Sequence, residues 1–314
     1  MGRSLTSIAD LSDEEISHLF DLSRIFLEVN EREIPKVPAL RGKTVATVFF
    51  ENSTRTRLSF ELAATRLSAD VLTFTLGSSS VSKGESLRDT AETIESLGAD
   101  LIVMRHSSSG SVKLVGSWLD IPVVNAGDGA HEHPTQALLD ALTIMDHFHM
   151  NSRLDGLRVA IVGDVLHSRV ARSNAQLLSR LGAEVNLVAP PALLPLDLSL
   201  WPVKSSFLLD EVLPQVDVIY MLRIQTERFS ESILPSMEEF SRSFSLTANR
   251  LGRAGKGAIV MHPGPIIRGL EISAEVADSP RSLIRTQVKN GIGIRMAVLY
   301  WLLGTDRDRV DPQW

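Results

Sequence analysis

Three similar stretches of sequence decide the fold: Arg66-Leu67-Ser68-Ala69-Asp70, Ser96-Leu97-Gly98-Ala99-Asp100 and Arg180-Leu181-Gly182-Ala183-Glu184. Each stretch ends a helical pattern of apolar residues and leads into a short apolar run. In two of them, Gly98 and Gly182 stand where the end of a helix needs a left-handed residue. Helices that alternate with apolar strands in this way predict a parallel sheet with helices on its faces.

The same alternation continues along the chain in two series. Apolar and β-branched runs predict strands at Thr44–Phe50, Val71–Thr75, Leu101–Met104, Val123–Asn125, Arg158–Val162, Glu184–Val188, Asp217–Met221 and Ala258–Met261. Capping signals and helical spacing predict helices at Asp13 to about Asn30, from near Thr54, at Pro134 to about Phe148, Ser168–Leu181 and roughly Gly293–Leu303. The polar residues 150–157 separate the series.

We therefore predict an α/β fold with two doubly wound parallel-sheet domains and a ligand site in the cleft between them. The first domain comprises residues 1–149 with a C-terminal helix at about 290–314, and the second comprises residues 150–289. The last helix is so apolar that it must pack against other elements.

The composition excludes several classes of protein. The 314 residues are 44% hydrophobic and 22% charged, which is typical of a globular protein of about two domains. Because there is no cysteine, disulfides, thiolate metal sites and cysteine nucleophiles are excluded. A net charge of −6 argues against nucleic-acid binding through bulk charge. Of the 32 basic residues, 25 are Arg, which codon bias or a function in binding carboxylates and phosphates would each explain.

The sequence argues against contact with a membrane, although Met1 to Thr6 fit the loose myristoylation pattern M-G-x-x-x-(S/T) with no polybasic patch after it. The first residues lack an apolar signal segment, and the longest apolar runs, Val45–Phe50 and Ala297–Leu303, are far shorter than the ~20 residues of a membrane-spanning helix. We expect a soluble, cytoplasmic protein with no membrane and no nucleic acid among its partners. Neither the dinucleotide fingerprint GxGxxG at a strand end nor the phosphate loop GxxxxGK(S/T) occurs, which disfavours a dehydrogenase or a P-loop enzyme.

The carboxyl ends of the strands in the first half carry candidate binding residues, because ligands of open parallel sheets bind at those ends. After the strand at Thr44–Phe50, Ser53-Thr54-Arg55-Thr56-Arg57 begins a helix whose N–H groups, hydroxyls and guanidinium groups would form a phosphate site. The alternative is plain capping of this helix by Ser53, with exposed arginines. Arg105 follows the strand at Leu101–Met104, where a solvated charge is the alternative.

Two further candidates begin the helix at Pro134. Proline suits the first helical position, so His133 is predicted at the N-cap and Gln136 at the third position, where their side chains can meet beside an anion. A metal site at His131, Glu132 and His133 is an alternative, although the spacing is not HExxH and no further ligand is evident.

Strand ends in the second half carry a similar set. Arg169 lies at a helix start, Arg223 and Gln225 share one face of an extended segment, and His262-Pro263-Gly264-Pro265 is a rigid turn. Burying several unpaired arginines would be costly. If Arg55, Arg105, Arg169 and Arg223 converge, their ligand is therefore a polyanion.

The order of these motifs resembles that of the aspartate/ornithine carbamoyltransferase superfamily over essentially the whole chain. The residues that carry the resemblance are Ser53-Thr54-Arg55-Thr56-Arg57, His133-Pro134-Thr135-Gln136 and Arg223-Ile224-Gln225. The segment Ser79–Glu85 resembles the lysine loop of the aspartate branch. The ornithine enzymes carry a cysteine where His262–Pro265 stands here, so the resemblance is to catalytic chains of aspartate carbamoyltransferases. Some members have Leu in place of Gly264.

The resemblance implies a role for each candidate in the transfer of a carbamoyl group from carbamoyl phosphate to L-aspartate, a step of pyrimidine biosynthesis. The carbamoyl-phosphate residues would be Ser53, Thr54, Arg55, Thr56, Arg105, His133, Gln136, Gly264 and Pro265. The catalytic ones among them would be Arg55, Thr56, Arg105 and His133. The aspartate residues would be Lys83, Arg169, Arg223 and Gln225. No metal and no other cofactor is implied.

The resemblance also implies a homotrimer in which Lys83 reaches the active site of a neighbouring subunit. Family members assemble further with a regulatory chain or a dihydroorotase-like partner, and the sequence does not choose between these. A carbamoyltransferase for ornithine or an acetylated relative is the alternative enzyme, although a cationic substrate would suit Arg169 and Arg223 poorly. A non-catalytic scaffold is the alternative of another class, and it predicts losses among the site residues that the sequence does not show.

Overall fold

The structure, a computed structural model, describes residues 3–75, 85–225 and 236–304. The chain divides into two units: unit 1 is Met1–Leu139 with Lys289–Trp314, and unit 2 is Asp140–Val288. Each has its own parallel sheet with helices packed on it, so the chain is α/β with two domains. We describe each unit by itself.

In unit 1, the described strands form a four-stranded parallel sheet in the order β2-β1-β3-β4. The strands are β1 (Thr44–Phe49), β2 (Asp70–Thr75), β3 (Leu101–His106) and β4 (Val123–Asp128). The helices are η1 (Ile8–Asp10), α1 (Asp13–Asn30), α2 (Thr54–Arg66), α3 (Leu87–Ser96), α4 (Ser111–Gly116), the start of α5 (Pro134–His147) and most of α11 (Ile284–Leu303).

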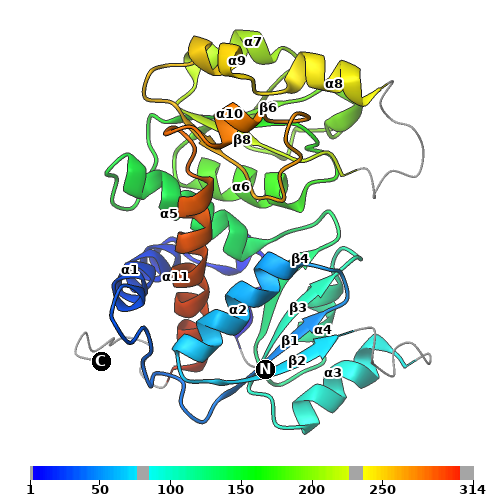
Figure 1. Cartoon of the computed structure of the whole chain (residues 1–314). Helices are drawn as coiled ribbons and strands as arrows, with labels where there is room; N and C mark the ends of the chain where they lie inside the picture. Colours follow the sequence, from blue (N-terminus) through cyan, green and yellow to red (C-terminus); the bar gives the residue numbers. More distant parts are fainter. Residues whose placement is uncertain (1–2, 76–84, 226–235, 305–314) are drawn as a thin grey trace. The chain divides into compact units, whose positions relative to one another are not determined.

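Helices cover both faces of the unit 1 sheet (Figure 1). Ala46 and Val48 of β1 pack in one apolar cluster with Ile94 of α3 and Val115 of α4. Thr47, which points to the opposite face, donates a hydrogen bond of 3.3 Å to Glu61 of α2. The sheet therefore lies between α2 on one side and α3 with α4 on the other.

In unit 2, the described strands form a five-stranded parallel sheet in the order β7-β6-β5-β8-β9. The strands are β5 (Arg158–Val162), β6 (Glu184–Val188), β7 (Lys204–Ser206), β8 (Val218–Met221) and β9 (Ile259–Met261). The helices are α6 (Arg169–Arg180), η4 (Pro191–Leu193), α7 (Leu209–Val212), η5 (Leu213–Gln215), α8 (Met237–Phe244), α9 (Ala248–Arg253) and α10 (Ala274–Ala277).

The three repeated stretches form the predicted helix-to-strand joins. Gly98 and Gly182 have φ angles of 91° and 100°, in the left-handed region where glycine avoids a steric cost. Ser68 occupies the corresponding position of the first join with φ 64°, and its hydroxyl donates to the carbonyl of Val37 at 2.9 Å. The joins after α2, α3 and α6 therefore share one conformation, as their sequences predict.

Some boundaries differ from those predicted. Arg105 is not beyond its strand but inside β3, paired in register with Phe49 of β1. β7 was missed because its residues are mostly exposed and lack an apolar pattern. The last helix was predicted from Gly293, but α11 begins at Ile284.

The glycines of α11 explain why its start was missed. In the sequence, Gly293 suggests a boundary of the helix. In the structure it faces α1, and a Cβ at this position would lie 2.7 Å from Cγ of Leu27. α1 and α11 run side by side in unit 1 (Figure 1), with the rings of Phe26 and Tyr300 5.8 Å apart. Close packing of two helices therefore requires the glycine that local propensity disfavours.

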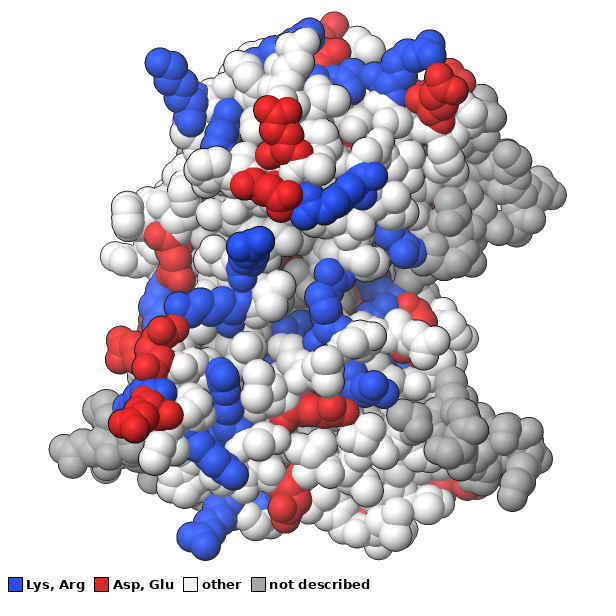
Figure 2. All heavy atoms as spheres, in the orientation of Figure 1, with Lys and Arg blue, Asp and Glu red and all other residues white. Residues whose placement is uncertain are grey.

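The surface and the helices agree with the composition. Basic and acidic side chains are interspersed over the described residues of the face in Figure 2. Among the helices of residues 3–75, 85–225 and 236–304, none has the length and apolar character needed to cross a membrane.

Candidate active site

The strand order of unit 1 contains a switch point between β1 and β3. The chain leaves β1 toward β2 on one side and leaves β3 toward β4 on the other, so the two connections diverge. Ligands of open α/β sheets bind in the crevice that such divergence opens at the carboxyl ends of the strands. The predicted residues of the first half lie at the ends of β1, β3 and β4, on this edge of the sheet.

The N-terminus of α2 follows β1 and carries the first candidates. Ser53 is the N-cap residue of α2, but its side chain makes no capping hydrogen bond, so plain capping does not account for it. Thr54 and Arg55 are exposed in this unit, whereas Thr56 is buried. The helix dipole and the first N–H groups favour an anion here.

Arg105, at the end of β3, links its neighbours on both sides. Its Nη2 donates to Oε1 of Glu51 at 2.5 Å, and its Nη1 donates to the carbonyl oxygen of Ala126 in β4 at 3.4 Å. Glu51 follows β1, so this ion pair spans the switch point. The Arg105 side chain is only 13% exposed, which limits screening by solvent.

A rigid turn holds His133 at the start of α5. The His133 carbonyl accepts from the N–H groups of Gln136 and Ala137, as predicted for the residue before the helix. Just upstream, Glu132 is 2% exposed and accepts from the Ser7 hydroxyl at 2.5 Å and the Ile8 N–H at 2.9 Å. The N-terminal segment thus anchors the turn that presents His133 and Gln136.

Asp128 forms the other side of this turn and is 1% exposed. Burial alone would raise its pKa, but hydrogen bonds from His131, Asn125 and the Gly110 N–H outweigh burial and hold the pKa below the usual value.

The alternative of a metal site at His131, Glu132 and His133 finds no support here. The Glu132 carboxylate binds Ser7 and Ile8 and so stabilises the turn. Within the described residues, no group of three His, Asp or Glu side chains is arranged to hold a metal ion.

Unit 2 has its own switch point, between β5 and β8. β5 leads to β6 and β7 on one side, while β8 and β9 lie on the other. Asp164, just beyond β5 and fully buried, accepts from the His167 N–H at 3.2 Å and from His167 Nδ1 at 2.8 Å. Its second oxygen accepts from the Gln225 N–H, beyond β8, at 3.0 Å. Asp164 therefore connects the two strand ends.

The predicted aspartate residues lie on the segments that Asp164 connects. Arg169 is the first residue of α6 and is 4% exposed, next to Ser168, whose hydroxyl accepts from the Ala171 N–H. Arg223 and Gln225 are partly exposed, and Ile224 between them is buried. This alternation confirms that Arg223 and Gln225 share a face.

The turn after β9 carries the last candidates. Gly264 has φ 64° and its peptide bond to Pro265 is cis. His262 is buried in front of them, whereas Gly264 and Pro265 are partly or fully exposed. Lys83 lies outside the described residues.

Three acidic residues that join segments near the strand ends were not predicted: Glu51, Asp164 and Glu271, which accepts from the Ile267 N–H in the turn after β9. The signal for the first two was their position directly after β1 and β5, where a carboxylate that accepts hydrogen bonds can join neighbouring strand ends. Glu271 lies well after β9 in sequence and carries no such positional signal.

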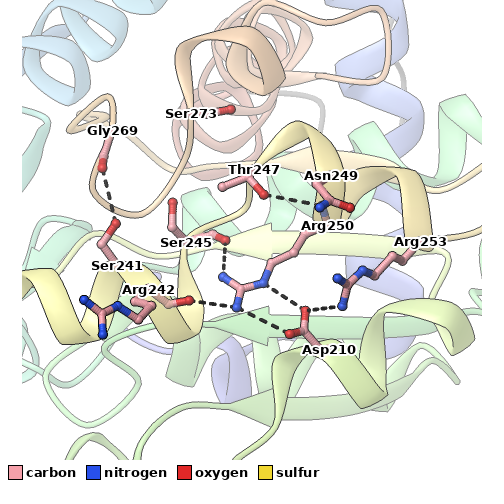
Figure 3. Close-up of a pocket in the computed structure, with 10 residues that line it drawn as sticks. All are labelled: Asp210, Ser241, Arg242, Ser245, Thr247, Asn249, Arg250, Arg253, Gly269 and Ser273. Carbon is pink, nitrogen blue, oxygen red and sulfur yellow. Dashed lines mark hydrogen bonds and ion pairs between the residues drawn. The ribbon is translucent and has the colours of Figure 1, made fainter.

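Unit 2 also has a cavity of about 420 Å³ that none of these candidates lines (Figure 3). It is lined by Asp210, Ser241, Arg242, Ser245, Thr247, Asn249, Arg250, Arg253, Gly269 and Ser273. The Arg250 guanidinium at its centre donates to Asp210 at 2.9 Å and to the Ser245 carbonyl at 2.8 Å. We interpret Arg250 as a structural residue that links α7, α8 and α9 through its hydrogen bonds.

Known protein families match both halves of the chain. Two family models match the chain: "Aspartate/ornithine carbamoyltransferase, carbamoyl-P binding domain" over residues 3–146 and "Aspartate/ornithine carbamoyltransferase, Asp/Orn binding domain" over residues 155–302. The aspartate carbamoyltransferase catalytic subunit of Thermobifida fusca is 57% identical over 300 residues, which cover 96% of this chain and 95% of the relative.

Solved structures are also similar. The catalytic subunit of M. jannaschii aspartate transcarbamoylase is 40% identical, with a TM-score of 0.84 over 96% of this chain and 98% of that one. The Trypanosoma cruzi aspartate transcarbamoylase in complex with carbamoyl phosphate and aspartate is 35% identical, with a TM-score of 0.87 over 96% and 97%.

The chain belongs to the aspartate/ornithine carbamoyltransferase family. Its activity is that of the aspartate branch, aspartate carbamoyltransferase.

Proposed function

We propose that the two switch points divide the substrates of this activity between them. The unit 1 site binds carbamoyl phosphate and the unit 2 site binds L-aspartate, and the reaction yields N-carbamoyl-L-aspartate and phosphate for pyrimidine biosynthesis. The observation that carries the proposal is that arginines lie at or beyond the carboxyl ends of the strands at each switch point, Arg105 in unit 1 and Arg169 with Arg223 in unit 2. These are the groups that bind phosphate and carboxylate anions.

In unit 1, the start of α2 binds the phosphate. The Ser53, Thr54 and Thr56 hydroxyls donate to its oxygens, and Arg55 supplies a guanidinium. Arg105 is shared between phosphate and the carbamoyl carbonyl, and its ion pair with Glu51 orients the guanidinium for both. His133 and Thr56 donate to the carbonyl oxygen, and Gln136 holds the carbamoyl NH₂.

In unit 2, the two carboxylates of aspartate are bound by Arg169, Arg223 and Gln225. Asp164 fixes the relative position of these residues because it accepts hydrogen bonds from both segments that carry them. Backbone carbonyl groups at Gly264 and Pro265 accept from the carbamoyl NH₂. A cationic side chain such as that of ornithine would meet two guanidinium groups here, which disfavours it.

The reaction joins the substrates, so both residue sets act on one substrate pair. The aspartate amine attacks the carbamoyl carbon, negative charge grows on the carbonyl oxygen, and the bond to phosphate breaks. Donors fixed around that oxygen stabilise the transition state more than the ground state. The departing phosphate accepts the proton that the amine loses.

The assembly and location of the chain complete the proposal. We place the carbamoyl-phosphate domain at residues 1–149 with about 290–314, and the aspartate domain at residues 150–289. The chain forms a cytoplasmic homotrimer with shared sites, to which a neighbouring subunit contributes Lys83. A regulatory chain or a dihydroorotase-like partner is the candidate for higher assembly.

The test is product formation by the purified chain from carbamoyl phosphate with aspartate or with ornithine. We expect turnover with aspartate and at most trace turnover with ornithine. Arg55→Ala should abolish turnover without unfolding the protein, whereas Arg88→Ala, an exposed arginine of α3 paired with Glu92, should not. Turnover with ornithine alone, or full activity of Arg55→Ala, contradicts the proposal.

A further inference from the structure

The turn that carries Gly264 and Pro265 encloses a buried acid–imidazole pair. Both side chains, His262 and Glu271, have no exposed surface, and Nε2 of His262 lies 3.1 Å from Oε1 of Glu271. Burying a carboxylate is costly unless hydrogen bonds compensate it. The hydrogen bonds that Glu271 accepts must therefore compensate the cost of burying its carboxylate.

The hydrogen bonds define which nitrogen of His262 carries its proton. The Gly264 N–H donates to Nδ1 of His262 at 2.7 Å, so Nδ1 is an acceptor. A neutral imidazole with Nδ1 as acceptor has its proton on Nε2, which then donates to Glu271. The opposite tautomer would set an N–H against the Gly264 N–H and break this bond.

Glu271 also holds the far side of the same turn. Its Oε1 accepts from the Ile267 N–H at 2.7 Å as well as from His262. One carboxylate oxygen thus joins the two ends of the segment that contains Gly264 and Pro265. The other oxygen, Oε2, is buried and has no hydrogen-bond partner among the described residues, so the known bonds of this carboxylate all serve the turn.

The base of the turn is fixed separately. The His262 N–H donates to Gln287 at 3.0 Å, and Gln287 donates to the buried carboxylate of Asp140 at 2.7 Å. Tyr220 and Asn174 donate to the other oxygen of Asp140. This network holds the backbone N–H of His262. The imidazole itself is bonded by Glu271 at Nε2 and by the Gly264 N–H at Nδ1.

We propose that Glu271 is a positioning residue. It holds His262 as the Nε2–H tautomer, and the imidazole in turn fixes the backbone at Gly264 and Pro265 in the conformation that receives the carbamoyl NH₂. The role of the turn rests on the proposed function. The effect of Glu271 on the tautomer rests on the hydrogen bonds alone.

The first test compares two substitutions of Glu271. Glu271→Leu removes the acceptor and should lower kcat by about 10- to 100-fold through misplacement of the turn. It should also weaken carbamoyl phosphate binding while leaving the binding of inorganic phosphate unchanged, because the turn contacts the carbamoyl group and not the phosphate. Glu271→Gln keeps an acceptor oxygen and should stay within about threefold of the unchanged protein. Glu275→Leu, at an exposed site on α10, is the matched control.

The second test reads the tautomer by ¹⁵N NMR of the histidine-labelled full chain, with the His262 signals assigned from His262→Asn. We expect a protonated Nε2 and an unprotonated Nδ1 in the unchanged protein, and loss of this pattern in Glu271→Leu. If Glu271→Leu does not fold, His262→Asn and His262→Leu replace it. Asn places an acceptor near the position of Nδ1, so His262→Asn should retain more activity than His262→Leu.

The outcomes separate this inference from the proposed function. If the unchanged protein does not turn over aspartate but Glu271→Leu shows the expected change of tautomer, the function is overturned and the positioning role is supported. Normal turnover with an unchanged tautomer and unchanged kcat in Glu271→Leu overturns the positioning role. Equal activity of His262→Asn and His262→Leu would also contradict it.

Discussion

Arg105 donates to Glu51 across the ends of β3 and β1, with Nη2 and Oε1 2.5 Å apart. In unit 2, Asp164 makes the corresponding connection between β5 and the segment after β8 through the Gln225 N–H. Each switch point thus has a carboxylate that follows the first strand of its sheet. These carboxylates hold the groups that we assign to the substrates, so their removal should affect the two substrates differently.

Glu51→Gln should lower kcat/KM for carbamoyl phosphate by about 10- to 100-fold, because Arg105 loses the charge that orients it. The effect on the KM for aspartate should be small. Initial rates at varied carbamoyl phosphate test this. Glu92→Gln, at an exposed ion pair of the same unit, is the control. Unchanged kinetics of Glu51→Gln would show that Arg105 needs no orienting partner.

Asp164→Ala should raise the KM for aspartate by about tenfold or more, because the turn with His167 and the segment with Gln225 lose their shared acceptor. It should also lower the free energy of unfolding by about 1–3 kcal/mol through unsatisfied buried donors. Kinetics at saturating carbamoyl phosphate and urea unfolding measure the two effects. Asp197→Ala, exposed in the same unit, should show neither. A change confined to the KM for carbamoyl phosphate would oppose our assignment.

Asp128 predicts a pH dependence of stability. Its pKa is lowered in the folded state, so it stabilises the fold above the unfolded pKa of about 4, and this contribution is lost as pH falls through the lower folded value. Asp128→Asn should lower the free energy of unfolding at pH 7 by about 1–3 kcal/mol. Urea unfolding between neutral and acid pH should show the gap to the unchanged protein narrowing below about pH 4. If the difference in free energy of unfolding widened on acidification, the prediction would be wrong. Asp120→Asn, exposed in the same unit, is the control.

Alanine substitutions at the glycines of the helix-to-strand joins should lower the free energy of unfolding by different amounts. Gly98→Ala meets no atom within 4 Å, so it should cost only the left-handed conformation, about 1–2 kcal/mol. Gly182→Ala should cost more, because its Cβ would lie 1.9 Å from Oδ1 of Asp155. Gly252→Ala, in open space within α9, should be neutral or stabilising. Thermal unfolding gives the order, and equal effects at all three sites would contradict it.

Local signals in the sequence were sufficient for much of the fold. The capping box of Ser12 and Glu15 forms at α1, and β5 and β6 have the predicted bounds, since caps and apolar runs depend on nearby residues. β7 and the start of α11 could not be predicted in this way. An exposed edge strand has no apolar pattern, and the glycines of α11 are set by packing against distant residues such as Leu27.

The candidate site shows the same limit. Arg105, His133, Arg169 and Arg223 were visible because they lie at strand ends or helix starts. The carboxylates that hold them were not, because an acidic residue in a sequence does not reveal its partner. The Glu271–His262 pair joins a turn to a residue after it, and only the folded backbone brings the two together.

The central claim is that the Arg223 segment binds aspartate and the Arg105 end binds carbamoyl phosphate. The most direct measurement is the pair of KM values for Arg223→Ala, with each substrate varied in turn. Our account predicts that the KM for aspartate rises at least tenfold while the KM for carbamoyl phosphate stays within about twofold. A rise in the KM for carbamoyl phosphate with an unchanged KM for aspartate would contradict it.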